Sequence, residues 1–205
     1  FQGFLGWYMV SSGLVNRVDV SHFRLSVHLV IAFLILSLIF WNYLKINKKN
    51  DIFNKINPVI PFLFLFLIFV QIIIGAFVSG MDAGKIYNSW PFMGNTYFPN
   101  DNDFVNLFKL SALSDPSLVQ FLHRNLAYII GIYYIFMLYK IYKNKITDLY
   151  RSINLVGIFI ILQIILGIFT IINGAQIYIA SMHQISSIFL VSSSIYFLYL
   201  NTESN

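Results

Sequence analysis

Long apolar runs are the feature that most constrains how this chain can fold. An apolar run of about 18 or more residues can cross the hydrocarbon core of a membrane as a helix. Five runs meet this length, at residues 25–44, 59–79, 118–139, 153–172 and 177–200. With 58% hydrophobic and 10% charged residues and a mean hydropathy of +0.74, the chain does not have the composition of a soluble domain. We therefore predict an all-α fold, a polytopic helical bundle in a membrane.

A sixth apolar run, from Phe1 to Val15, is shorter than the others. The chain begins with Phe rather than Met, and no signal-peptide pattern precedes the run. We interpret the run as part of a sixth transmembrane helix, and the sequence as an N-terminally truncated fragment.

The basic residues are concentrated in two short loops between apolar runs. The net charge of +5 could indicate nucleic-acid binding, but one side of the predicted membrane carries the whole excess. Because Lys and Arg are enriched in cytoplasmic loops, we place both loops on the cytoplasmic or matrix side, of a bacterial cell membrane or a mitochondrial inner membrane, and exclude nucleic acid as a partner. The basic residues are Lys45, Lys48, Lys49 and Lys55 in the first loop, and Lys140, Lys143, Lys145 and Arg151 in the second.

Three histidines lie at about the same depth in the predicted helices. His28, His123 and His183 are each within about two turns of the outer end of a helix that runs inward. An ionisable residue inside a membrane span is costly and by default marks a functional site. One such histidine could be satisfied by a neighbouring hydroxyl or carbonyl group. Three independent core histidines would not be expected to agree in depth.

A small side chain follows each of these histidines by four residues. Positions four apart stack on one helix face, and here they hold Ala32, Ala127 and Ser187. The resulting slot favours a porphyrin with a histidine on its iron, although small residues also occur where membrane helices simply pack tightly. Cysteine is absent, which excludes a disulfide, a zinc–thiolate site and an iron–sulfur cluster carried by this chain.

An internal repeat relates the first helix pair to the last. We therefore interpret the second half of the chain as a four-helix unit. Its two histidines, His123 and His183, are the arrangement expected for bis-histidine haem. By the same logic, the first half should be a four-helix unit whose missing helix pair carries the histidine facing His28. A weaker form of the repeat opens at residues 71–76. The aligned residues are Gln2, Leu5, Gly6 and Gly13 in one copy, and Gln163, Leu166, Gly167 and Gly174 in the other.

Two arginines adjoin the histidines. Arg124 directly follows His123, and Arg24 lies one turn before His28. Their guanidinium groups can pair with haem propionates, for which their fork geometry is suited, or can snorkel to the membrane interface. His22 is not on the same helix face as His28, which favours interfacial hydrogen bonding over ligation.

The outer loop, residues 80–117, is the longest segment without an apolar run. It could cap a haem pocket in the C-terminal half, or form an interfacial aromatic belt. We favour the cap, with Trp90 among its contacts, because loops of this length are more often functional than not. The residues concerned are Asp82, Tyr87, Asn88, Trp90, Pro91, Tyr97 and Phe98.

Five motifs follow one another along the chain. They are Gln2-Gly3-x-Leu5-Gly6-Trp7-Tyr8-Met9-Val10-x-Ser12-Gly13-Leu14, Val20-Ser21-His22-Phe23-Arg24-Leu25-x-x-His28-Leu29, Gly80-Met81-Asp82-Ala83-Gly84-x-x-Tyr87-Asn88-Ser89-Trp90-Pro91-x-Met93, Gln120-Phe121-x-His123-Arg124, and His183-Gln184. In this order and on this topology, the motifs resemble the haem A synthase family, and most closely its cysteine-free alphaproteobacterial and mitochondrial branch. The resemblance covers the chain from end to end.

The resemblance implies an eight-helix protein of two four-helix halves, of which six helices are present here. Residues 1–46 would be the remnant of the N-terminal half, on the substrate haem side, and residues 47–57 a cytoplasmic linker. Residues 58–200 would be the C-terminal half, on the haem b side. The family's reaction-centre glutamate would lie upstream of this chain, so no catalytic residue is assigned and the fragment alone is expected to be inactive.

The resemblance also implies roles for particular residues. His123 and His183 are expected to bind the iron of haem b, the prosthetic group, and His28 the iron of the substrate, haem O. The reaction would oxidise the C8 methyl of haem O through an alcohol to the formyl group of haem A, in the biosynthesis of the cytochrome oxidase cofactor. Arg124, Arg24 and Trp90 are the candidates for other contacts with haem.

The main alternative is a bis-histidine membrane cytochrome b that only transfers electrons. It would hold both haems permanently, whereas a synthase would hold one firmly and exchange the other. A structural subunit without cofactor would require the three aligned histidines to be coincidental. Expected partners are haem O delivered by a haem O synthase, an electron-transfer protein and the lipid bilayer, and a homo-oligomer is compatible with the sequence.

Overall fold

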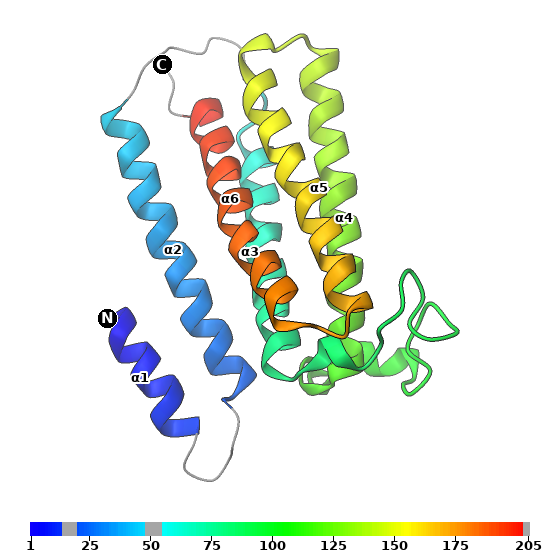
Figure 1. The fold of residues 1–205 in the computed structure, drawn as a ribbon. Helices are drawn as coiled ribbons and strands as arrows, with labels where there is room; N and C mark the ends of the chain where they lie inside the picture. Colours follow the sequence, from blue (N-terminus) through cyan, green and yellow to red (C-terminus); the bar gives the residue numbers. More distant parts are fainter. Residues whose placement is uncertain (14–19, 48–54, 203–205) are drawn as a thin grey trace.

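The computed structural model describes residues 1–13, 20–47 and 55–202 and shows an all-α fold, as predicted (Figure 1). Across these residues no β-strand forms beyond an isolated bridge between Met93 and Thr96. The α-helices are α1 (Gln2–Gly13), α2 (His22–Ile46), α3 (Val59–Gly80), α4 (Pro116–Lys143), α5 (Tyr150–Ile172) and α6 (Ile177–Thr202).

Five helices, α2 to α6, are long and apolar enough to cross a membrane. The first helix, α1, has 12 residues. At about 1.5 Å per residue it reaches roughly 18 Å, less than the hydrocarbon thickness of about 30 Å. The composition-based prediction of membrane-spanning helices is therefore confirmed for the five long helices.

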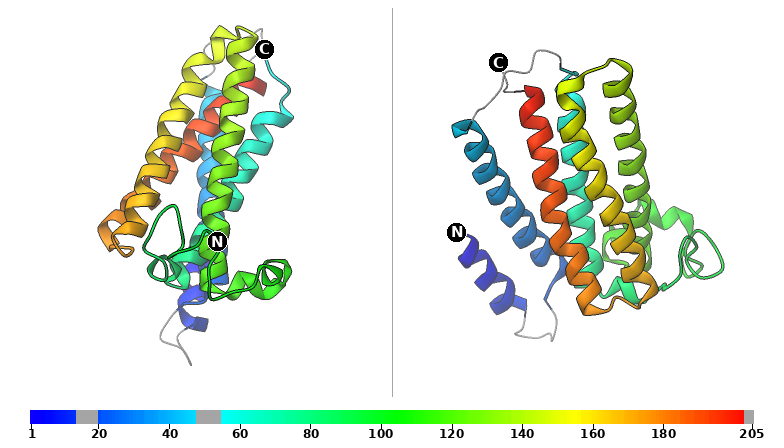
Figure 2. Two further views of the ribbon diagram at one scale, coloured as in Figure 1. Left: turned by 90° about the vertical axis from the view of Figure 1, so that its right-hand side faces the viewer. Right: turned by 45° about the horizontal axis from the view of Figure 1, so that its top comes forward.

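The helices alternate in direction, so α2, α4 and α6 begin at one end of the molecule, and α3 and α5 end there (Figures 1 and 2). Helices α3 to α6 form a bundle, in which α3 packs on α4 and α6, and α5 on α4 and α6. Helix α2 lies against α3 and α6, and α1 packs on α2. We call the end where α2, α4 and α6 begin the histidine end, because His28, His123 and His183 lie in the first turns of these helices.

An apolar core cluster extends toward the opposite end of the bundle, where α4 ends and α5 begins. Phe64 near the start of α3 and Met137 near the end of α4 are fully buried, together with Ile153 on α5 and Val191 on α6. Asn201 closes this end, since its side chain exchanges two 2.9 Å hydrogen bonds with the backbone N–H and C=O of Ile56.

The segment between α3 and α4 folds over the histidine end (Figure 2). It contains three short 3₁₀ turns, η1 (Ala83–Lys85), η2 (Phe104–Phe108) and η3 (Leu110–Ser114). Asp115 then caps α4, accepting a 3.0 Å hydrogen bond from the Leu118 N–H, and Pro116 occupies the first turn, where no backbone donor is needed. This cap fixes where α4 starts and therefore how deep His123 lies.

Candidate functional site

The three histidines lie at matching positions in their helices. His28, His123 and His183 follow the first residues of α2, α4 and α6 by six, seven and six positions. Because these helices begin at the same end of the molecule, the imidazoles share about one level.

His123 and His183 face each other inside the bundle of α3 to α6. Their ring centroids are 6.5 Å apart and the ring planes are nearly perpendicular, at 83°. The Nδ1 atoms of both rings are buried and find no hydrogen-bond partner in the described part of the chain. A metal bound to one nitrogen of each ring at about 2 Å separates the centroids by roughly 6 Å. The pair therefore fits an iron held by two axial histidines.

A glutamine on the preceding helix contacts each histidine-bearing helix in the same way. The Nε2 atoms of Gln2, Gln71 and Gln163 donate to the backbone carbonyl oxygens of the three histidines. The distances are 2.9 Å to His28, 3.0 Å to His123 and 3.1 Å to His183. Each bond joins neighbouring helices at the level of the imidazole.

A glycine lies four residues after each glutamine, on the same helix face. A Cβ atom built on Gly6, Gly75 or Gly167 would stand 3.1 to 3.2 Å from the Cε1 atom of the facing histidine. Such contacts are tighter than nine in ten real Cβ contacts. Glycine at these positions therefore lets each imidazole lie directly against the neighbouring helix backbone.

The sequence repeat predicts only part of this arrangement. Gln2 and Gly6 align with Gln163 and Gly167, whereas residues 71–76 resemble these copies more weakly. The structure gives all three copies the same contacts. The shared spacing of glutamine and glycine four residues apart was the signal that could have found them. We call each set a Gln–Gly–His unit, with residues 2, 6 and 28, residues 71, 75 and 123, and residues 163, 167 and 183.

The three units differ in what else the glutamine touches. Gln2 Nε2 lies 3.2 Å from Nδ1 and 3.4 Å from Nε2 of the His28 ring. Gln71 Nε2 lies 3.4 Å from Nε2 of His123. Gln163 instead donates to the hydroxyl of Ser186, which itself donates to the His183 carbonyl at 3.0 Å. The unit on α5 and α6 is thus held by an additional side chain.

His22 belongs to a different contact from His28. Its ring meets Phe77 edge to face, with centroids 5.2 Å apart, and it lies 4.2 Å from the Phe23 ring. A Cβ on Gly80 would come within 2.8 Å of the His22 Cα, so the start of α2 is in close contact with the end of α3. Interfacial hydrogen bonding by His22 stays a prediction.

Arg124 is buried, and its guanidinium binds the outer loop. It donates to the carbonyl oxygens of Tyr87 at 2.9 Å, Ser89 at 2.9 Å and Phe92 at 3.3 Å. Binding to a haem propionate stays a prediction for this residue, but loop anchoring is the role that these contacts define. The guanidinium of Arg24 lies over the Tyr8 ring of α1, 5.1 Å from its centroid.

Further side chains of α4 hold the same loop. Gln120 Nε2 donates to the Tyr87 carbonyl at 3.0 Å. Trp90 Nε1 donates to the Tyr128 hydroxyl at 3.0 Å, and the Tyr97 hydroxyl donates to Asn125 Oδ1. The loop is thus attached directly to the helix that carries His123, and its role as a cap over a haem pocket stays a prediction.

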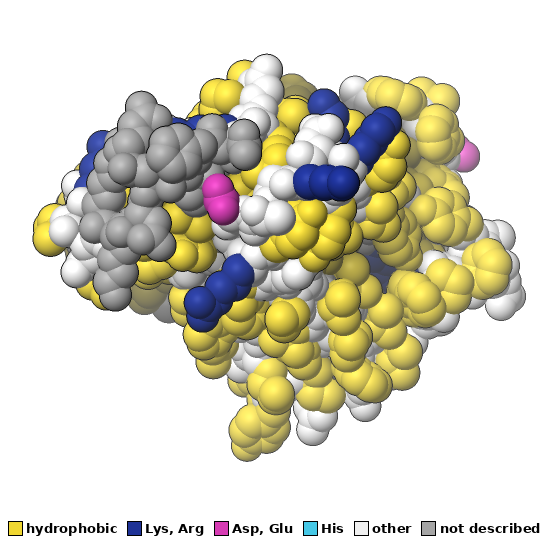
Figure 3. Space-filling model, turned by 90° about the horizontal axis from the view of Figure 1, so that it is seen from above, with side chains coloured by type: hydrophobic (Ala, Val, Ile, Leu, Met, Phe, Trp, Pro, Cys, Tyr) yellow, Lys and Arg dark blue, Asp and Glu magenta, His cyan; other side chains and the backbone are white. Residues whose placement is uncertain are grey.

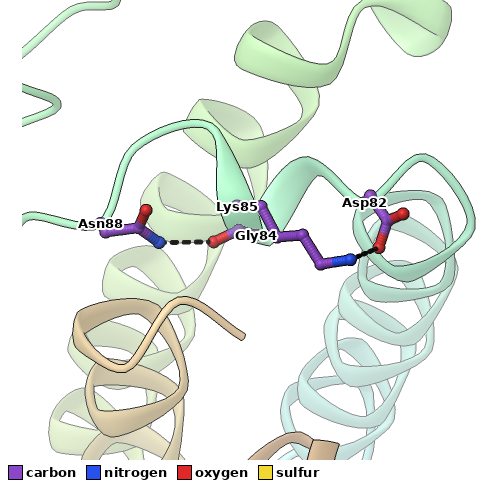
Figure 4. A network of polar contacts seen from close by, with 4 residues as sticks. All are labelled: Asp82, Gly84, Lys85 and Asn88. Atoms are coloured by element: carbon purple, nitrogen blue, oxygen red, sulfur yellow. Dashed lines mark hydrogen bonds and ion pairs between the residues drawn. The ribbon is translucent and has the colours of Figure 1, made fainter. Parts of the chain in front are cut away.

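The Asp-Ala-Gly segment at the start of the loop contacts the turn between α5 and α6. Asn88 Nδ2 donates to the carbonyls of Gly84 at 3.1 Å and Ile171 at 3.0 Å. Figure 4 shows Asn88 reaching Gly84, and the exposed ion pair in which Lys85 Nζ lies 2.8 Å from Asp82 Oδ1. A Cβ on Gly84 would lie 3.1 Å from that of Ala175, which explains why the smallest residue stands there. This segment therefore connects the loop to the α5–α6 pair.

A hydrogen-bond network inside the loop perturbs two titratable groups. Partial burial raises the pKa of Asp101, but hydrogen bonds from Ser117 at 2.6 Å and from the Tyr87 hydroxyl at 2.9 Å outweigh it. The pKa of Asp101 is therefore below its ordinary value. The pKa of Tyr87 is raised, chiefly by burial and then by its hydrogen bond to Asp101.

A cavity of about 560 Å³ lies elsewhere, lined by Arg151, Asn154, Leu155, Ile158 and Tyr196. These residues are at the start of α5 and near the end of α6, toward the lysine-rich loops. No histidine lines it. The cavity is therefore distinct from the Gln–Gly–His units.

Comparisons with known proteins find relatives along the whole length of the chain. Residues 1–195 match the model of the family COX15-CtaA, described as "Cytochrome oxidase assembly protein". The chain is 48% identical over 204 residues to "Heme A synthase" of Pelagibacter ubique, an alignment covering 100% of this chain and 60% of the relative. It is 38% identical to "Heme A synthase" of Flavobacterium johnsoniae (97% and 60% covered) and 38% identical to that of Rickettsia prowazekii (98% and 61% covered). No solved structure matches the chain.

Proposed function

We propose, from the premise that this chain belongs to the Cytochrome oxidase assembly protein family, that the whole protein is a haem A synthase. It would convert the C8 methyl of haem O through an alcohol to the formyl group of haem A. Because the chain spans about 60% of the length of the curated relatives it matches, the activity belongs to the whole protein. The observation that carries the proposal is the facing pair of His123 and His183 beside a third, equivalent unit at His28.

His123 and His183 would hold a resident haem b, each through one ring nitrogen. Such a haem supplies one-electron transfer when bound. Gly75 and Gly167 give each imidazole room against the neighbouring helix. The apolar core toward the lysine-rich loops closes the pair off from water on that side. The loop attached through Arg124 would limit water entry from the other side.

His28 would bind the iron of the substrate haem O. It lies at the level of the resident pair, on a helix that packs against α3 and α6. The conversion of a methyl to a formyl group takes its oxygen from water and releases electrons and protons. A substrate site beside an electron-transfer site at one depth suits this requirement. The role of this chain would be to ligate, to orient and to control access of water.

The remaining parts of the proposal concern organisation and partners. Residues 1–46 would belong to the substrate half, residues 47–57 to a linker, and residues 58–200 to the haem b half. The end where α4 and α6 terminate, on which several Lys and Arg side chains are seen in Figure 3, would face the cytoplasm or matrix. A haem O synthase would supply the substrate, and an electron-transfer protein would remove electrons.

An electron-transfer cytochrome b is the second candidate, because the His123–His183 pair alone fits it equally well. The two functions differ in how firmly the haems are held. A cytochrome would keep two haem b groups permanently. A synthase would keep one haem b and exchange the other haem.

The experiment that separates the two is extraction of haem from the purified full-length protein, followed by chromatographic identification. The proposal predicts haem b together with substoichiometric haem O, haem A or the hydroxylated intermediate. Two haem b per protein, with none of the others, would contradict it and favour the cytochrome.

A further inference from the structure

The glutamine of each Gln–Gly–His unit hydrogen-bonds to the histidine's own peptide carbonyl. Inside an α-helix, the carbonyl of residue i already accepts the N–H of residue i+4. A second donor from a neighbouring helix therefore adds a contact that the histidine helix does not need for its own stability. Its effect is to fix how that helix is rotated and how far it stands from its neighbour.

Rotation and separation determine where an imidazole points. A histidine ring has few torsions, so the direction of its metal-binding nitrogen follows the helix that carries it. The contact is present at all three histidines, with nearly equal lengths of 2.9, 3.0 and 3.1 Å. Helix packing alone does not require a glutamine, since small residues and van der Waals contact are sufficient in membranes.

We propose that Gln71 and Gln163 are positioning residues for the axial histidines of the resident haem, and that Gln2 has the same role for His28. The inference rests on the proposed function, because it assumes that His123 and His183 bind iron. Groups beyond the ligands themselves commonly orient a metal-bound histidine and tune the metal. Here the orienting contact is with the peptide group of the ligand.

The proposal predicts that replacing Gln71 affects the resident haem more than replacing Gln163. The His183 carbonyl accepts hydrogen bonds from both Gln163 and the Ser186 hydroxyl, so one donor remains when Gln163 is replaced. In the described part of the chain no serine hydroxyl assists Gln71 in this way, and the Gln71 Oε1 atom is buried without a hydrogen-bond partner. Removal of the Gln71 amide thus leaves the His123 carbonyl without its interhelical donor.

The test is to replace Gln71 by leucine in the full-length protein and to measure the resident haem directly. We expect the affinity for haem b to fall about 10- to 100-fold, the range by which metal affinity falls when groups that orient metal ligands are lost, and haem b to dissociate faster than in the wild type. The midpoint potential and the low-spin electron paramagnetic resonance signal should shift as well. Gln163→Leu should show the same changes with a smaller amplitude.

Two further variants make the result decisive. Gln2→Leu removes the same contact from the His28 unit, so it should leave the haem b potential and spectrum as in the wild type. Gln71→Met is unbranched and similar in length, so it decides the matter if Gln71→Leu fails to fold. If Gln71→Met keeps the wild-type potential, spectrum and dissociation rate of haem b, the positioning role is overturned.

The failure of the inference differs from the failure of the proposed function. A wild-type protein that purifies with haem b, together with unchanged glutamine variants, would overturn the inference alone. A correctly folded wild-type protein that binds no haem b when haem is supplied would overturn both.

Discussion

The Gln–Gly–His unit occurs in two regions of this molecule, which differ in the number of units they contain. Helices α3 to α6 contain two Gln–Gly–His units, whose histidine rings stand 6.5 Å apart. Helices α1 and α2 contain one unit, in which the glutamine amide lies across the ring of His28 at 3.2 and 3.4 Å. Each unit thus places a single imidazole at a defined level, and the proposed iron site requires two units that face each other.

The regions also differ in how completely they are packed. In the bundle of α3 to α6, the side chains of Phe64, Met137 and Ile153 are 0% exposed. In α1, the large residues Phe4 and Trp7 are 60% and 63% exposed. Tight packing favours a permanently bound group, because exchange requires neighbouring side chains to move. The tighter packing of α3–α6 supports the proposal that the resident haem lies in this bundle and that His28 holds the exchangeable one.

The largest effect should come from filling the space beside a histidine of the resident pair. Gly167→Leu would place a side chain where even a Cβ stands 3.2 Å from His183 Cε1, so the imidazole must move. We expect most haem b to be absent from the purified full-length protein, measured as the ratio of haem absorbance to protein. Gly131→Leu on α4 is the matched control, because nothing lies within 4 Å of its built Cβ. Equal haem loss in both variants would contradict the account.

Loss of the buried loop anchor should be the next largest effect. Arg124→Gln removes donors to three loop carbonyls, and hydrogen bonds from charged groups contribute about 1.5–3 kcal/mol each at most. We expect residues 81–115 to become accessible to protease and haem b to dissociate faster. Arg24→Gln, which removes a guanidinium from the Tyr8 ring, should leave both properties of the resident site unchanged. Equal protease sensitivity of the two variants would contradict the claim that Arg124, and not Arg24, anchors the outer loop.

The loop's tryptophan should have a smaller effect. Trp90→Ala removes one hydrogen bond, to Tyr128, and a side chain that is 43% exposed. With a net worth of about 0.5–1.5 kcal/mol for such a bond, haem b release should accelerate by less than about tenfold. Stopped-flow transfer of haem to an apo-globin measures this rate. An unchanged rate would favour the aromatic-belt interpretation of the loop over the cap.

The smallest effect should be a change in loop stability at acid pH. Because the pKa of Asp101 lies below its ordinary value of 3.8 in the folded protein, the carboxylate's stabilising contribution is fully present above that value. It is lost as the pH falls below about 4, through the lowered pKa. Hydrogen-exchange protection of residues 81–115 should therefore fall over this range in the wild type. Asp101→Asn should have lower protection at neutral pH and lose this pH dependence.

Much of the fold follows from sequence because apolar runs and charge asymmetry are local signals. The runs predicted α2 to α6, and the histidines' positions in those runs predicted their common level. The contacts between helices were harder to predict, because they depend on which faces meet. Gln71 shows this: residues 71–75 differ from residues 163–167 at only one position, Ile74 against Leu166, but this local likeness does not reveal which helix the Gln71 side chain contacts.

The outer loop was the least predictable part. Its residues have no periodicity that shows which helix it covers, and the carbonyl groups that bind Arg124 carry no side-chain signature. Sequence reasoning could therefore place Arg124 beside His123 but could not separate a role toward haem from one toward the loop. The anchoring contacts with Tyr87, Ser89 and Phe92 became visible only in three dimensions.

The most direct test of the central claim compares His183→Ala with His28→Ala in the full-length protein. Haem b content and its low-spin spectrum would be measured after purification. The account predicts that His183→Ala loses the bis-histidine low-spin signal, whereas His28→Ala retains it and loses only haem O, haem A or the intermediate. An unchanged low-spin spectrum in His183→Ala would contradict the account, because the His123–His183 pair could then not be the site of the resident haem.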